Sequence, residues 1–185
     1  MSQQKNRIWL EGAIVAALSM ALSFIPLKFG PGFSISIGMF PLIVYAFRRG
    51  TKPALMSGLM WGLLHFVMGK AHILTVSQAL IEYLLAYTFI GMAGVYSTKI
   101  KEAVRTNSRS VYLYLGLGTV VGIISRYVWH VIAGVIFWGK YAMWGLSPLM
   151  YSLVINGTSA VLTGLATYAL LILTMKKNKK LLLPS

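Results

Sequence analysis

The chain of 185 residues contains no cysteine and no aspartate, and its acidic residues are three glutamates. Without cysteine, neither a disulfide framework nor a thiolate metal site can form. Charged residues make up 11% of the chain, against about 25% in a typical soluble domain. The apolar fraction is 57%, so the polar surface that a water-soluble fold needs on all sides is missing. The composition therefore indicates an integral membrane protein.

Sequence motifs for catalysis are also missing. The chain has no GxxxxGK[ST] loop, so we do not expect it to hydrolyse ATP, and it has no HExxH zinc motif. Without aspartate and cysteine, the usual nucleophile constellations cannot be assembled. We therefore expect no enzyme, no metal site and no cofactor. A net charge of +14 is typical of nucleic-acid-binding proteins, but here the basic residues stand in short loops between apolar runs, which excludes that partner.

Six apolar runs have lengths typical of helices that cross a lipid bilayer, for which about 20 residues are needed. Open sheet edges are not tolerated in lipid, so helices are expected rather than strands. The sequence predicts an all-α integral membrane protein, with residues 1–185 forming a single domain of six transmembrane helices. The expected helices cover residues 8–26, 33–47, 53–69, 77–98, 111–138 and 148–175. The first run is not expected to be a cleaved signal peptide, because further membrane segments follow it.

The basic residues are distributed unevenly between the two sets of loops. If the N-terminus is cytoplasmic, all but four of the 17 lysines and arginines lie on the cytoplasmic side. The exceptions are Lys28, Lys70 and Lys140 in outer loops, and Arg126 inside the fifth helix. This asymmetry predicts that both termini are cytoplasmic. The stretch 99–110 is expected to be the longest cytoplasmic loop, lying at the lipid headgroups.

Two loop motifs predict local structure. Gly30-Pro31-Gly32 predicts a tight turn in the first outer loop. Ser147-Pro148 has the pattern of a helix N-cap followed by proline at the first helical position, so the sixth helix is expected to start there.

Glu82 lies about five residues inside the outer end of the fourth expected helix. A carboxylate at such a position costs about 2.5–3.5 kcal/mol unless a partner or water compensates it. It could form a structural ion pair with Arg126, or it could be the counter-charge for a cationic ligand. The second interpretation is favoured, because ionisable residues inside a membrane are functional by default.

The fifth and sixth helices contribute further candidates. His130 and Trp138 are eight residues apart, so they lie near one stripe of a helix. Trp138 is either an interfacial anchor or a flat platform for an aromatic or cationic ring, and His130 could simply bond to a neighbouring helix. Tyr151 lies near the outer end of the sixth helix, and Asn156 is either a ligand contact or an interhelical hydrogen-bond donor.

These polar and aromatic candidates converge on one depth. With the orientation set by the loop charges alone, all of them fall in the outer half of the membrane, on the last three helices. One carboxylate, several aromatic rings and an amide suit a flat, positively charged ligand that forms hydrogen bonds. The set comprises Glu82, Tyr83, His130, Trp138, Tyr151 and Asn156. Arg126, a turn below His130, is expected to lock helices together rather than to contact the ligand.

Small residues recur along the first helix. Ala13, Ala17 and Ala21 are spaced by four, with Gly12 and Ala16 beside them. Such spacing lets helices approach closely. The stripe could pack inside the bundle or form a docking surface for a partner membrane protein, and the sequence leaves both open.

Residues 126–139 and 151–157 resemble the thiamine-specific substrate-binding subunits (S-components) of energy-coupling factor vitamin transporters. Ile81-Glu82-Tyr83 and the alanine stripe add to the resemblance, which covers nearly the whole chain. It implies a multi-pass protein of the bacterial cell membrane that captures thiamine from the extracellular side. Uptake would be driven by ATP through a membrane coupling subunit (T-component) and two separate ATPase subunits.

The resemblance also implies roles for individual residues. Thiamine contacts fall on Glu82, His130, Trp138, Tyr151 and Asn156, with Tyr83 as a neighbour. The family covers its ligand with an aromatic residue of the first outer loop; Phe33 is the candidate here, where a tryptophan would be expected in a close relative. Ala13 and Ala17 resemble the surface that docks on the coupling subunit.

Three other functions are compatible with the sequence. The chain could bind another vitamin such as riboflavin or biotin, although the carboxylate of biotin fits poorly with Glu82. It could be a self-sufficient transporter, or a structural membrane adaptor without a small-molecule ligand.

Overall fold

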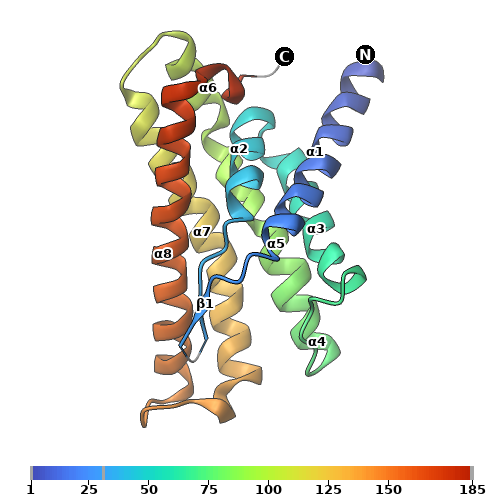
Figure 1. Ribbon diagram of the computed structural model, residues 1–185, viewed down its shortest axis with the longest axis vertical. Helices are drawn as coiled ribbons and strands as arrows, with labels where there is room; N and C mark the ends of the chain where they lie inside the picture. Colours follow the sequence, from blue (N-terminus) through green and yellow to red (C-terminus); the bar gives the residue numbers. More distant parts are fainter. Residues whose placement is uncertain (1, 31, 184–185) are drawn as a thin grey trace.

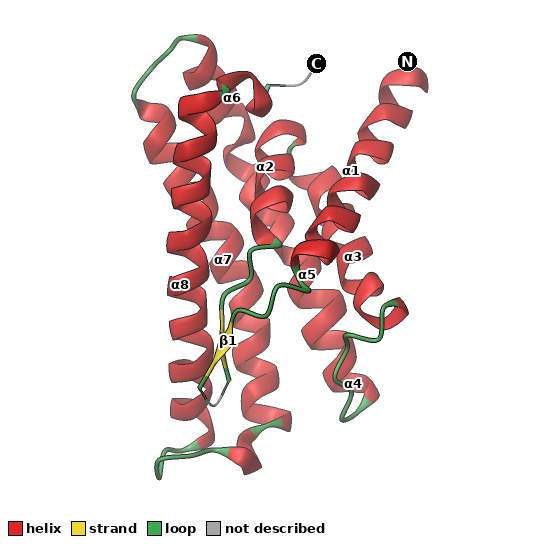
Figure 2. Ribbon diagram, in the orientation of Figure 1, coloured by secondary structure: helices red, strands yellow, loops and turns green. Residues whose placement is uncertain are grey.

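Helices form most of the computed structural model, which describes residues 2–30 and 32–183 (Figures 1 and 2). The sheet within those ranges is one antiparallel hairpin of two short strands. The elements in chain order are α1 (Ser2–Leu22), β1 (Lys28–Phe29), β2 (Phe33–Ser34), α2 (Met39–Arg49), α3 (Thr51–Val67), α4 (Val76–Ala79), η1 (Leu80–Leu85), α5 (Ala86–Phe89), η2 (Ile90–Tyr96), α6 (Ser97–Arg105), α7 (Ser110–Phe137), η3 (Gly139–Tyr141), α8 (Pro148–Lys177) and η4 (Lys179–Leu182).

Three helices of the described chain are long and apolar enough to cross a membrane. They are the continuous helix Val76–Arg105, which comprises α4 to α6, and the helices α7 and α8. The expectation of an all-helical protein with apolar spans is therefore confirmed. The start of α8 is also as predicted, because the Ser147 hydroxyl accepts a hydrogen bond from the backbone N–H of Met150 and Pro148 occupies the first turn.

The predicted second helix, residues 33–47, is wrong at its start, because α2 begins only at Met39. Residues 33 and 34 form β2 instead. The backbone N–H groups of Ser34 and Ser36 donate to the hydroxyls of Ser159 and Thr163 on α8, both at 3.1 Å. These side chains satisfy the backbone groups that a helix would otherwise pair internally, so the segment stays extended.

Other boundaries also differ from the prediction. The first helix ends at Leu22 rather than near residue 26. The stretch 99–110 is mostly helical, since α6 runs to Arg105, and the connection to α7 is only residues 106–109. The basic residues Lys99, Lys101 and Arg105, which suggested a loop, lie on α6. Ile100 and Ala103 of the same helix are buried. The turn predicted at residues 30–32 is consistent with the β1–β2 hairpin, although Pro31 itself lies outside the described residues.

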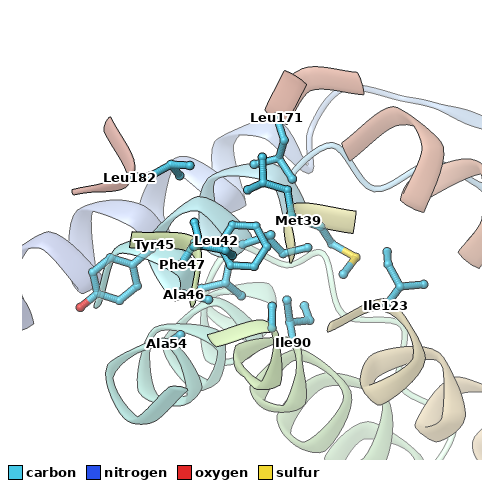
Figure 3. Packing of buried hydrophobic residues seen from close by; sticks show 14 of the residues in the cluster. Met39, Leu42, Tyr45, Ala46, Phe47, Ala54, Ile90, Ile123, Leu171 and Leu182 are labelled. Carbon is cyan, nitrogen blue, oxygen red and sulfur yellow. The ribbon is translucent and has the colours of Figure 1, made fainter. Parts of the chain in front are cut away.

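The core lies around α2, whose inward side chains Met39, Leu42 and Phe47 are fully buried (Figure 3). Glycines let the neighbouring helices approach this centre closely. A Cβ at Gly58 or Gly62 of α3 would collide with the backbone of the helix that contains η1 and α5. This close packing fixes the position of η1, which contributes residues to the site described below.

Both termini lie at one end of the bundle, and the turn of the hairpin points toward the other (Figure 1). At the terminal end, Glu11 of α1 forms ion pairs with Arg48 at 2.7 Å and Arg49 at 2.6 Å. The Tyr45 hydroxyl donates to the backbone carbonyl of Ile8 at 2.7 Å. These contacts fasten one side of α1 to α2 and leave its opposite side exposed.

Candidate ligand-binding site

A cavity of about 760 Å³ opens between the hairpin, η1, α7, η3 and α8. This volume is within the range of about 300–1,000 Å³ that is typical of small-molecule sites. Six of the seven residues predicted to bind ligand line it, namely Glu82, Tyr83, His130, Trp138, Tyr151 and Asn156. The structure therefore brings together side chains that are up to 74 positions apart in the sequence.

Glu82 and Tyr83 stand on η1, a π-helical turn between two α-helical segments. Such wide turns inside α-helices are rare and occur frequently at functional sites. The Glu82 carboxylate accepts hydrogen bonds from the Gln78 side-chain amide and from the Trp138 Nε1–H, the latter at 2.8 Å. Both donors are uncharged, so they hold the carboxylate in place without neutralising it.

The possible ion pair between Glu82 and Arg126 does not form. Within the described ranges, the ion pairs all involve Glu11 at the other end of the molecule. Arg126 instead donates from Nη1 to the Ser36 hydroxyl at 2.9 Å and from Nε to His130 at 3.2 Å. Arg126 thus bonds to two other side chains, and the Glu82 carboxylate forms no ion pair within the described residues.

Aromatic rings form the wall around Glu82. The ring of His72, in the loop after α3, lies 5.4 Å from the ring of Trp138, and Tyr141 lies 5.9 Å from Trp138 on another side. The backbone N–H of His72 donates to the Tyr83 hydroxyl at 2.8 Å. The loop after α3 is thus attached to the same helix that positions Glu82.

The opposite wall comes from α8. The Asn156 side-chain amide donates to the backbone carbonyl of Ser152 at 3.1 Å and to that of His130 at 3.4 Å, so it joins α8 to α7. Gly134 of α7 has no room for a Cβ, because the Ser152 hydroxyl occupies that space. The interhelical role considered for Asn156 is therefore present, and its side chain also borders the cavity.

Phe33 is not among the described residues that line this cavity. Its ring stacks between Phe29, at 5.9 Å, and Trp144, at 6.5 Å. Trp144 in turn lies 5.6 Å from the ring of Tyr151. Phe33 therefore belongs to an aromatic group that contacts Tyr151, a lining residue of the cavity.

The sequence interpretation missed several lining residues, among them Lys28, His72 and Met143. Lys28 stands in the short strand β1 and the other two stand in loops, where no spacing pattern distinguishes a lining residue from an exposed one. Tyr141 also lines the cavity and had one usable signal, since it is an aromatic residue in the same interhelical connection as Trp144.

A second cavity of about 300 Å³ adjoins the first, and both are bordered by Lys28, Ser34 and Tyr83. Its remaining polar lining includes Arg126 and Lys70, and it contains no carboxylate. The negative charge of the combined site is therefore confined to the larger cavity.

Comparisons with known proteins find relatives that match almost the whole chain. The sequence profile of the thiamine transporter protein family (Thia_YuaJ) matches residues 9–183. The chain is 37% identical to the thiamine transporter ThiT of Lacticaseibacillus paracasei over 175 residues, which cover 90% of this chain and 86% of that protein. It is 31% identical to ThiT of Bacillus subtilis over 166 residues, covering 87% and 86%.

A solved structure of ThiT from Listeria monocytogenes has the same fold. It superposes with a TM-score of 0.95 at 45% sequence identity, and the match covers 97% of this chain and 99% of that one. Sequence and fold thus agree along almost the entire length, and the chain belongs to the thiamine transporter protein family.

Proposed function

We propose that this protein is the substrate-binding subunit of an energy-coupling factor importer and that it captures thiamine in the cavity around Glu82. The observation that carries the proposal is a carboxylate held by two neutral donors, without an ion-pair partner among the described residues, in a cavity walled by aromatic rings. Thiamine is a permanent cation with two flat rings, so it complements both features.

The lining residues suggest a division of roles. Glu82 offsets the positive charge of the ligand or accepts a hydrogen bond from its amino group. Trp138 and His130 stack on the rings, since aromatic faces attract both flat and cationic groups. Tyr151 and Asn156 form hydrogen bonds to the pyrimidine.

The proposed membrane arrangement has six crossings with both termini in the cytoplasm of a bacterial cell. The three apolar spans supply half of these crossings, and α1, α2 and α3 supply the rest. α2 is only about 16 Å long at 1.5 Å per residue, so the extended segment before it completes that passage. Because the basic loops lie at the end that holds the termini, the cavity faces the extracellular side.

One face of α1 is proposed to dock on the membrane coupling subunit, with ATP hydrolysed by separate ATPase subunits. Ala13 and Ala17 are exposed, and so are the neighbouring Leu10, Ile14 and Leu18. Small residues among exposed apolar ones allow another helix to approach closely. The opposite side of α1 is already occupied, which leaves this face for a partner or for lipid.

The direct test is to titrate the purified, detergent-solubilised protein with thiamine while tryptophan fluorescence is recorded. Riboflavin and biotin serve as controls. Saturable quenching by thiamine alone is expected, since Trp138 lines the cavity. If calorimetry on the folded protein detects no binding of any of the three vitamins, the chain is not a vitamin-binding subunit.

A further inference from the structure

A buried arginine, Arg126, joins the segment between β2 and α2 to the ring of His130. Only 6% of its surface is exposed. Its Nη1 donates to the Ser36 hydroxyl at 2.9 Å, and its Nε donates to His130 Nε2 at 3.2 Å. The guanidinium group also lies over the ring of Tyr87, 4.4 Å from its centroid. Contacts from three directions therefore fix the orientation of this side chain.

These contacts determine the protonation of His130. A guanidinium group has only donors, so the nitrogen that faces it must accept. An imidazolium ring carries hydrogen on both nitrogens and could not accept this bond, whereas a neutral ring has one donor and one acceptor. His130 is consequently neutral, with its hydrogen on Nδ1.

The remaining N–H of His130 is available to a ligand. His130 borders the larger cavity. Its Nδ1 forms no hydrogen bond within residues 2–30 and 32–183, and the Asn156 amide contacts only the backbone carbonyl of His130. The N–H on Nδ1 is thus left without a hydrogen-bond partner among the described residues.

We infer that Arg126 is a positioning residue that holds His130 in its neutral Nδ1–H form, so that the ring facing the ligand carries no positive charge. The inference rests on the proposed function insofar as the ligand is a cation. A second positive charge on His130 would repel such a ligand. The guanidinium, which remains protonated, prevents that charge and at the same time orients the ring.

The ring nitrogens can be observed directly by ¹⁵N NMR on ligand-free protein with labelled histidine. The chain has three histidines, and the variant His130→Asn identifies the signals that belong to His130. In the unaltered protein, Nδ1 should be protonated and Nε2 unprotonated. In Arg126→Gln the His130 ring should lose this preference and give the signals of a mixture of the Nδ1–H and Nε2–H tautomers.

Two further variants separate this role from general packing. Ser36→Ala removes the other acceptor of Arg126 and should leave the His130 signals unchanged. Arg126→Lys keeps a cationic donor and should retain more of the Nδ1–H form than Arg126→Gln does. A hydrogen on Nε2 of the unaltered protein would overturn the inference, and so would an unchanged His130 spectrum in a folded Arg126→Gln protein. If Arg126→Gln does not fold, the unaltered protein and Arg126→Lys decide the question.

Calorimetry with thiamine then tests whether the protonation form of the His130 ring affects the affinity for the ligand. Arg126→Gln should bind about tenfold more weakly than the unaltered protein, and Arg126→Lys should lie between the two. Absence of binding by the unaltered protein would refute the proposed function, while the NMR result on the ligand-free protein would stand separately.

Discussion

Replacement of Glu82 by glutamine tests the counter-charge with the smallest possible change of shape. In the structure, one carboxylate oxygen accepts from Trp138 and the other accepts from Gln78. A glutamine at position 82 can still accept from Trp138. Its NH₂ group would face the NH₂ group of Gln78, so one of the two hydrogen bonds is lost together with the negative charge.

The expected loss of affinity follows from the change in hydrogen-bond type. A hydrogen bond to a charged group contributes about 1.5–3 kcal/mol, against about 0.5–1.5 kcal/mol for a neutral one. Glu82→Gln should therefore weaken thiamine binding by about 1.4 kcal/mol or more, which is at least about tenfold in the dissociation constant.

Isothermal titration calorimetry of both proteins in detergent measures this difference. Glu102→Gln is the matched control, because it makes the same chemical change at an exposed position of α6 and should leave the affinity unchanged. An equal dissociation constant for the unaltered protein and Glu82→Gln would refute the counter-charge reasoning.

Two further predictions concern residues that hold Glu82, or the helix that carries it, in position. Trp138→Phe keeps an aromatic ring but removes the Nε1–H that donates to Glu82, so calorimetry should show several-fold weaker thiamine binding; an unchanged affinity would show that the ring alone matters. Gly62→Ala should lower the free energy of unfolding by about 1–3 kcal/mol, because its Cβ would collide with the backbone carbonyl of Tyr83. Thermal unfolding in detergent checks this, with Gly157→Ala as control, since no atom lies within 4 Å of a Cβ there. Equal stability of the two glycine variants would contradict the packing argument.

The sequence by itself determined the helical class of the protein and grouped six residues that line one cavity. Lack of charge and long apolar runs fixed the helical membrane class, because backbone groups in lipid must be paired within a helix. The start of α8 was readable because the Ser147 cap and Pro148 act locally. Depth along the helices was enough to group Glu82, Tyr83, His130, Trp138, Tyr151 and Asn156, since rise per residue converts sequence position into height.

Only the tertiary structure decided which side chains pair across the bundle. The apolar stretch around residue 33 satisfies a helical pattern, yet hydroxyls of Ser159 and Thr163 hold its backbone extended. Charge alone left open whether Arg126 pairs with Glu82, whereas the structure shows that the partners of Arg126 are Ser36 and His130. Rise and periodicity describe one helix at a time, whereas these contacts depend on the rotation and spacing of helices relative to one another. Side-chain packing sets this rotation and spacing. It also places His72, which stands in a loop without a periodic sequence pattern, in the wall of the cavity.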